Sequence, residues 1–170
     1  MCCIRKKITE ILDAMIKFDY TVYMRNEFLY LLKGWLNMLK KFTVKNYKNF
    51  KDEISLDFSK IAGYQFNKDC LSMGLIGKIL IYGRNATGKT NFGRALLDIK
   101  ILLYGMFRNN ENSVLINADS QKDTAKFIYE FLFGSDEVIY KYSRFANTEL
   151  CDEELYINGE AIFKCDFKNS

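Results

Sequence analysis

Histidine is absent from this chain of 170 residues, and its absence excludes several kinds of site. No imidazole can act as a general base, and no metal can be held through histidine ligands. The five cysteines form no C-x-x-C pair and are odd in number, which argues against a zinc site and against a disulfide framework. We therefore expect reduced thiols and a cytoplasmic protein.

Long apolar runs are also missing. Glu10 and Asp13 interrupt the N-terminal segment where a signal peptide would be apolar, and no run is long enough to span a membrane. The formal net charge of +4 is a mild excess, which permits contact with nucleic acid without arguing for it. The length and the globular composition predict a core large enough to fold alone.

One stretch carries recognisable chemistry. Residues 83–90 read GRNATGKT and match the phosphate-binding pattern G-x-x-x-x-G-K-[ST] in full. The apolar run at residues 78–82 predicts a strand ahead of it. Apolar residues recur behind it at helical spacing, at Phe92, Ala95, Leu96, Ile99 and Leu103. Strand, glycine loop and helix are the context that this motif requires.

The residue types explain how such a loop holds a nucleotide. Gly83 and Gly88 let the backbone curl, so that successive N–H groups and the helix dipole face the phosphates. Lys89 is expected to reach the β- and γ-phosphates, and the Thr90 hydroxyl to bind Mg²⁺. The cofactors predicted are ATP and Mg²⁺. The nucleotide-binding residues predicted from the loop are Gly83, Arg84, Asn85, Ala86, Thr87, Gly88, Lys89, Thr90 and Asn91.

The rest of the chain divides into two predicted units. Residues 1–37 carry apolar stripes at helical spacing and are expected to form a helical extension. It either packs on the domain or anchors it to a membrane or a partner. A further hypothesis is that these residues are upstream read-through and that translation normally starts at Met38. Residues 38–170 are expected to form a partial ATP-binding lobe.

Alternating patterns predict the strands of that lobe. A hairpin is expected from about residue 39 to residue 58, and a helix over about residues 89–104. Further strands are expected around residues 127–133, 138–142, 150–157 and 160–163, with Asn158-Gly159 as a hairpin turn. Phe127, Tyr129, Phe131 and Phe133 share one face, which we interpret as the buried side of a sheet rather than a base-stacking platform.

Two segments resemble a known family. LKKFTVKNYKNFKDEISLDF and KILIYGRNATGKTNFGRALLDI are similar to the N-terminal half of an ABC/SMC/RecF-type ATPase head, especially to bacterial AAA-family ATPases with an ABC-like or OLD-like core. The resemblance implies an α/β P-loop NTPase lobe, with antiparallel strands flanking the strand–loop–helix unit. It also implies that Lys48 lies near the nucleotide. Ala86 replaces the usual glycine of the family, at a cost of about 1 kcal/mol if its φ is positive.

The resemblance implies ATP hydrolysis for the whole family, by two heads that enclose ATP between them. The second half of such a head is not found in this sequence, which looks like a truncated or split form. One alternative is that a second polypeptide supplies the missing half, which the sequence leaves open, and DNA is a partner by resemblance only. Asp152-Glu153 is not assigned as the Walker B pair, because the apolar segment before it is short, and the catalytic residues stay unassigned.

Two other functions remain open. One is a small P-loop kinase, which would need lid arginines, and only Arg108 and Arg144 follow the predicted helix. The other is a non-enzymatic module that docks on a membrane or partner through residues 1–37 and carries a vestigial nucleotide site.

Overall fold

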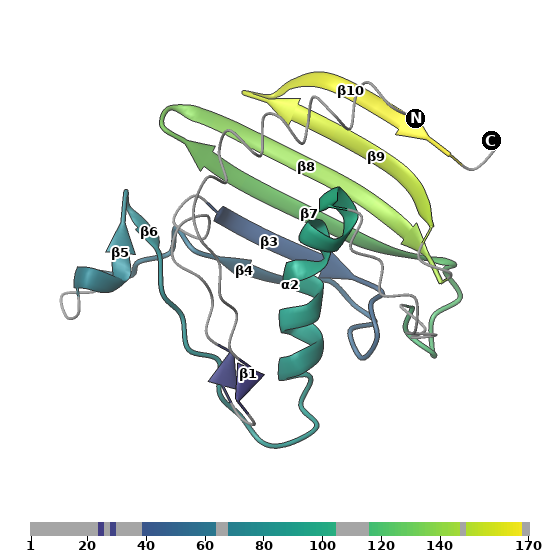
Figure 1. Cartoon of the computed structure of the whole chain (residues 1–170), viewed down its shortest axis with the longest axis horizontal. Helices are drawn as coiled ribbons and strands as arrows, with labels where there is room; N and C mark the ends of the chain where they lie inside the picture. Colours follow the sequence, from purple (N-terminus) through teal and green to yellow (C-terminus); the bar gives the residue numbers. More distant parts are fainter. Residues whose placement is uncertain are drawn as a thin grey trace.

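An antiparallel sheet of six strands forms the body of the molecule (Figure 1). The computed structural model describes residues 24–25, 28–29, 39–63, 68–104, 116–146 and 149–167. Within these residues the strand order in the sheet is β10-β9-β8-β7-β3-β4. The strands are β3 (Leu39–Lys45), β4 (Ile54–Asp57), β7 (Thr124–Phe133), β8 (Asp136–Phe145), β9 (Leu150–Ile157) and β10 (Glu160–Asp166).

The hairpins predicted from alternation are confirmed by the strand pairing. β3 pairs with β4, β7 with β8, and β9 with β10, all antiparallel. Asn158 and Gly159 both have positive φ, 51° and 82°, as a two-residue hairpin turn requires. Alternating apolar side chains thus predicted the strands, and the turn residues predicted where the chain reverses direction.

The remaining described elements are short, apart from one helix. Two small two-stranded sheets, β1–β2 and β5–β6, lie outside the main sheet, and β2 contacts the helix. These elements are β1 (Met24–Arg25), β2 (Phe28–Leu29), a 3-10 turn η1 (Lys68–Cys70), β5 (Leu71–Ser72), β6 (Leu75–Ile76) and α2 (Lys89–Tyr104).

Helix α2 packs across one face of the sheet and closes the core (Figure 1). Its buried face repeats at helical spacing through Phe92, Ala95, Leu96, Ile99 and Leu102. The sheet side of the core includes Phe42, Val44, Phe127, Tyr129, Phe131, Tyr140 and Tyr142. The interpretation of the aromatic alternation as a buried face is therefore confirmed.

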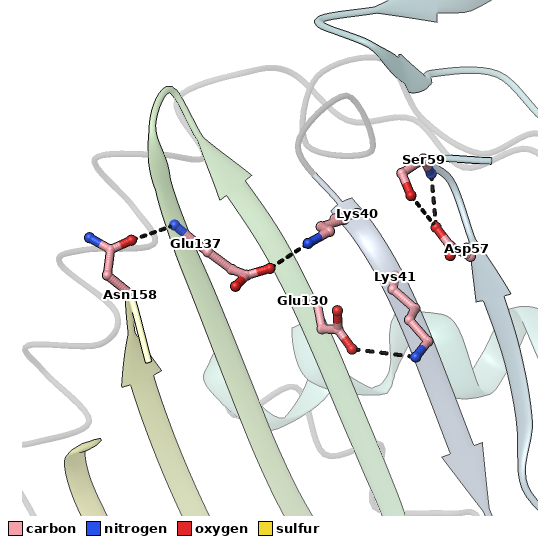
Figure 2. Close-up of polar contacts among 7 residues, drawn as sticks. All are labelled: Lys40, Lys41, Asp57, Ser59, Glu130, Glu137 and Asn158. Carbon is pink, nitrogen blue, oxygen red and sulfur yellow. Dashed lines mark hydrogen bonds and ion pairs between the residues drawn. The ribbon is translucent and has the colours of Figure 1, made fainter. Parts of the chain in front are cut away.

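Charged side chains join the strands at one end of the sheet. The Lys40 Nζ lies 2.5 Å from Oε1 of Glu137, and the Lys41 Nζ lies 3.7 Å from Oε1 of Glu130. Figure 2 shows both pairs linking strands of the sheet. The register of β3 against β7 shifts between Leu39 and Lys41, so Lys40 is a bulge residue that can reach β8. All four charged side chains are partly exposed, and such pairs contribute at most about 1 kcal/mol each. The buried face of the sheet, not this polar end, stabilises the fold.

The predicted α/β P-loop lobe is wrong. Every strand pair in the described residues is antiparallel, and residues 78–82, expected to be the strand before the loop, pair with none of the described strands. Their side chains nevertheless alternate, with Ile79 and Ile81 against the core and Leu80 and Tyr82 exposed by 54% and 82%. A strand needs a neighbour for its N–H and C=O groups, and periodicity alone does not reveal whether one is present.

The predicted N-terminal helices lie mostly outside the described residues. Where the structure describes this region, Met24–Arg25 and Phe28–Leu29 form a short antiparallel pair, so a helix is wrong at these positions. The predicted helix over residues 89–104 is confirmed as α2. Among the described residues, no helix is both long and apolar enough to cross a membrane.

Candidate phosphate-binding site

The start of α2 presents a row of backbone donors. The first helical hydrogen bond runs from the N–H of Phe92 to the carbonyl oxygen of Gly88, at 2.8 Å. Within the described part of the chain, the N–H groups of residues 84–91 donate to no protein acceptor. A helix leaves its first N–H groups without partners, and the preceding loop adds several more here. This end of the helix is therefore suited to an anion.

The loop before α2 is curled by its backbone angles. Ala86 and Gly88 have φ of 63° and 97°, and the Thr87 hydroxyl donates to the Arg84 carbonyl at 2.9 Å. A Cβ at Gly83 would lie 3.4 Å from the Thr87 Oγ1, in ordinary contact. The positive φ strains Ala86, which carries a Cβ, by about 1–2 kcal/mol. Gly88 suits its own position because its φ disfavours any side chain.

The Lys89 side chain folds back onto the first residues of this loop. Its Nζ donates to the carbonyl oxygens of Gly83, at 2.7 Å, and of Arg84, at 2.8 Å. An ammonium group has three N–H donors, so one remains for a ligand. The charge and the backbone donors of residues 84–91 thus occupy the same part of the surface.

The other predicted loop residues are accessible. Arg84, Asn85 and Thr90 are exposed, and in the described residues their side chains form no hydrogen bond or ion pair. Thr90 is in the first turn of α2, where its hydroxyl is open to a metal ion. In P-loop proteins the Ser or Thr at this position binds Mg²⁺ beside the substrate phosphates, so Thr90 is the residue of the loop that would hold the ion.

The turn at residues 47–50 lies against the loop. The contact is made by Asn49, which was not among the site residues predicted from the sequence. The amide of Asn49 contacts Gly88 and accepts a hydrogen bond from Nδ2 of Asn91, at 2.8 Å. The Lys48 ammonium lies 5.9 Å from the ring centroid of Tyr47, and in the described residues its side chain forms no hydrogen bond or ion pair with the loop. The sequence offered one indication of Asn49 as a site residue, which is that it directly follows Lys48 in the segment that carries the resemblance.

Helix α2 is fixed to the sheet by a buried polar network. The Asp98 carboxylate accepts hydrogen bonds from Arg144, at 2.7 Å, and from the Tyr142 hydroxyl, at 2.9 Å. The Tyr129 hydroxyl donates to the Ala95 carbonyl at 2.8 Å. Burial, and next the Asp98 carboxylate, raise the pKa of both Tyr129 and Tyr142 well above the usual value. The network holds the helix, and so the loop at its start, in one position.

The paired carboxylates of β9 are engaged in the sheet. Glu153 is buried and accepts a hydrogen bond from the Tyr140 hydroxyl at 2.6 Å, and Asp152 accepts one from Ser143 at 2.9 Å. Both lie in an antiparallel strand, so neither has the setting of a Walker B carboxylate. No protein-family model and no curated protein matches the chain.

Proposed function

We propose that residues 83–91 bind the triphosphate of ATP together with Mg²⁺. The observation that carries this proposal is the row of N–H groups at residues 84–91, which donate to no acceptor among the described residues and lie beside the Lys89 ammonium. Backbone N–H groups at a helix start attract phosphate through their partial charges and the helix dipole. The complete G-x-x-x-x-G-K-[ST] pattern at the same place makes a nucleotide the favoured anion.

Each side chain has a separate role in this proposal. Lys89 exchanges its contacts with the Gly83 and Arg84 carbonyls for contacts with the β- and γ-phosphates. Thr90 binds Mg²⁺ through its hydroxyl. Thr87 keeps the loop closed through its bond to the Arg84 carbonyl. Bound Mg²⁺ would neutralise phosphate charge, which the single ammonium of Lys89 cannot do alone.

The wider context comes from the resemblance to ABC/SMC/RecF-type ATPase heads. In that family a second head completes the site, and in this proposal a second polypeptide takes that part. The engagement of Asp152 and Glu153 in the sheet supports it, because neither is placed to orient an attacking water. The exposed Leu80 and Tyr82 side chains, just before the loop, also support a partner there. Hydrolysis then belongs to the assembled site.

Isothermal titration with Mg·ATP tests the proposal. Lys89→Ala should lower the affinity at least tenfold, because a hydrogen bond to a charged group contributes about 1.5–3 kcal/mol. Arg94→Ala is the matched control, since it removes the same charge from an exposed position on the same helix. It should stay within about threefold of wild type, as expected for a solvated surface charge. Equal affinities of wild type and Lys89→Ala would overturn the proposal.

A further inference from the structure

Asn49 lies at the tip of a tight turn that is docked beside the start of α2. The turn closes through two backbone hydrogen bonds between Tyr47 and Phe50, at 2.9 and 2.8 Å. Asn117 supports it by donating from Nδ2 to the Lys48 carbonyl at 2.5 Å. The ring of Phe50 packs edge-on against Phe92 of α2, with centroids 6.3 Å apart. The tip of the turn is therefore held in place next to the loop.

The exposed Asn49 amide is oriented by one side-chain hydrogen bond. Its Oδ1 accepts the hydrogen bond from Asn91, which turns its Nδ2 toward Gly88. A Cβ added at Gly88 would overlap this Nδ2 and would lie 3.1 Å from the Asn49 Cγ. In the described residues the Asn49 N–H₂ group donates to no acceptor. An oriented donor without a partner thus stands directly beside the backbone donors of the loop.

We propose that the Asn49 amide donates a hydrogen bond to a phosphate bound in the loop, as a ligand supplied from outside the motif. The inference rests on the function proposed above and adds one side chain to that site. A neutral amide extends the row of N–H donors without a second fixed charge. Asn91 is a positioning residue in this arrangement, because its own amide holds Asn49 in the donating orientation.

Asn49→Asp is the most informative change. Aspartate has nearly the same size and keeps an oxygen for Asn91, but it replaces the donor by a negatively charged acceptor. The affinity for Mg·ATP should fall at least tenfold, and the affinity for inorganic tripolyphosphate should fall by the same factor. The free energy of unfolding without ligand should stay close to wild type. Asn91→Ala should give a smaller loss, of a few fold, because it frees the amide without removing it.

Ser135→Asp is the matched control, since it adds the same charge in the exposed β7–β8 turn. It should keep both affinities within about twofold of wild type, as expected for a screened distant charge. A folded Asn49→Asp variant that binds both ligands like wild type would overturn the inference while leaving the Lys89 result intact. A loss confined to ATP would also overturn it, because the contact would then be to ribose or base. If wild type binds neither ligand, the proposed function and this inference fail together.

Discussion

The positive φ of Ala86 predicts that glycine at this position raises the free energy of unfolding. Its φ of 63° places a Cβ in the left-handed region, and Ala62, in a distant turn, has a similar φ of 48°. Glycine removes a strain of about 1–2 kcal/mol there but adds about 0.4–1 kcal/mol of unfolded-state entropy. Ala86→Gly and Ala62→Gly should each raise the free energy of unfolding by about 0.5–1 kcal/mol in urea. A loss of stability in both variants would show that the strain is not there.

Individual residues also show what the sequence could and could not predict. The loop residues follow from a local pattern, so Lys89 and Thr90 were predicted at their observed place at the start of α2. Asn49 was missed, because its contact with Asn91 joins positions 42 residues apart and depends on how the turn docks. Local patterns carry no information about such contacts.

At the scale of elements, α2 depends on its buried link to β8. Arg144 and Asp98 are almost fully buried and 2.7 Å apart. Removing one partner of a buried ion pair leaves the other charge without compensation, which costs about 3–5 kcal/mol. Arg144→Met should therefore lower the free energy of unfolding in urea by about that amount.

A double variant separates the charge effect from packing. Asp98→Leu combined with Arg144→Met removes both charges, so it should recover much of the stability lost in Arg144→Met. The Tyr142 hydroxyl loses its Asp98 acceptor in the double variant, which limits the recovery. A loss below about 1 kcal/mol in Arg144→Met would contradict the role given to this pair.

Elements also differed in how well the sequence predicted them. The hairpins were predicted because alternation and turn residues such as Asn158 and Gly159 are local signals. Residues 78–82 were predicted as a strand from a short apolar run, and the burial of their side chains does alternate as in a strand. None of the described strands pairs with residues 78–82, and pairing depends on a second segment that a local pattern does not reveal. The fold class was wrong for that reason.

At the scale of the whole molecule, buried tyrosines predict sensitivity to alkaline pH. The folded-state pKa of Tyr129 and Tyr142 is raised, so these groups stabilise the fold below their unfolded pKa of about 10. Above it the unfolded chain releases protons that the folded chain keeps, and stability falls. Each tyrosine should lower the free energy of unfolding by about 1.4 kcal/mol per pH unit above pH 10.

Urea unfolding at several alkaline pH values measures this slope. The variant with Tyr129→Phe and Tyr142→Phe lacks both groups, so its stability should fall less steeply than that of wild type between about pH 10 and 11. Identical slopes would show that the two hydroxyls ionise freely in the folded protein.

In the proposed site, the N–H groups of residues 84–91 donate hydrogen bonds to phosphate. Hydrogen–deuterium exchange of the wild-type chain, with and without Mg·ATP, measures these groups directly. Saturating Mg·ATP should slow exchange in peptides covering residues 84–91, and Lys89→Ala should lose this protection at the same ligand concentration. Unchanged exchange at residues 84–91 in the ligand-saturated wild-type protein would contradict the proposed phosphate contacts.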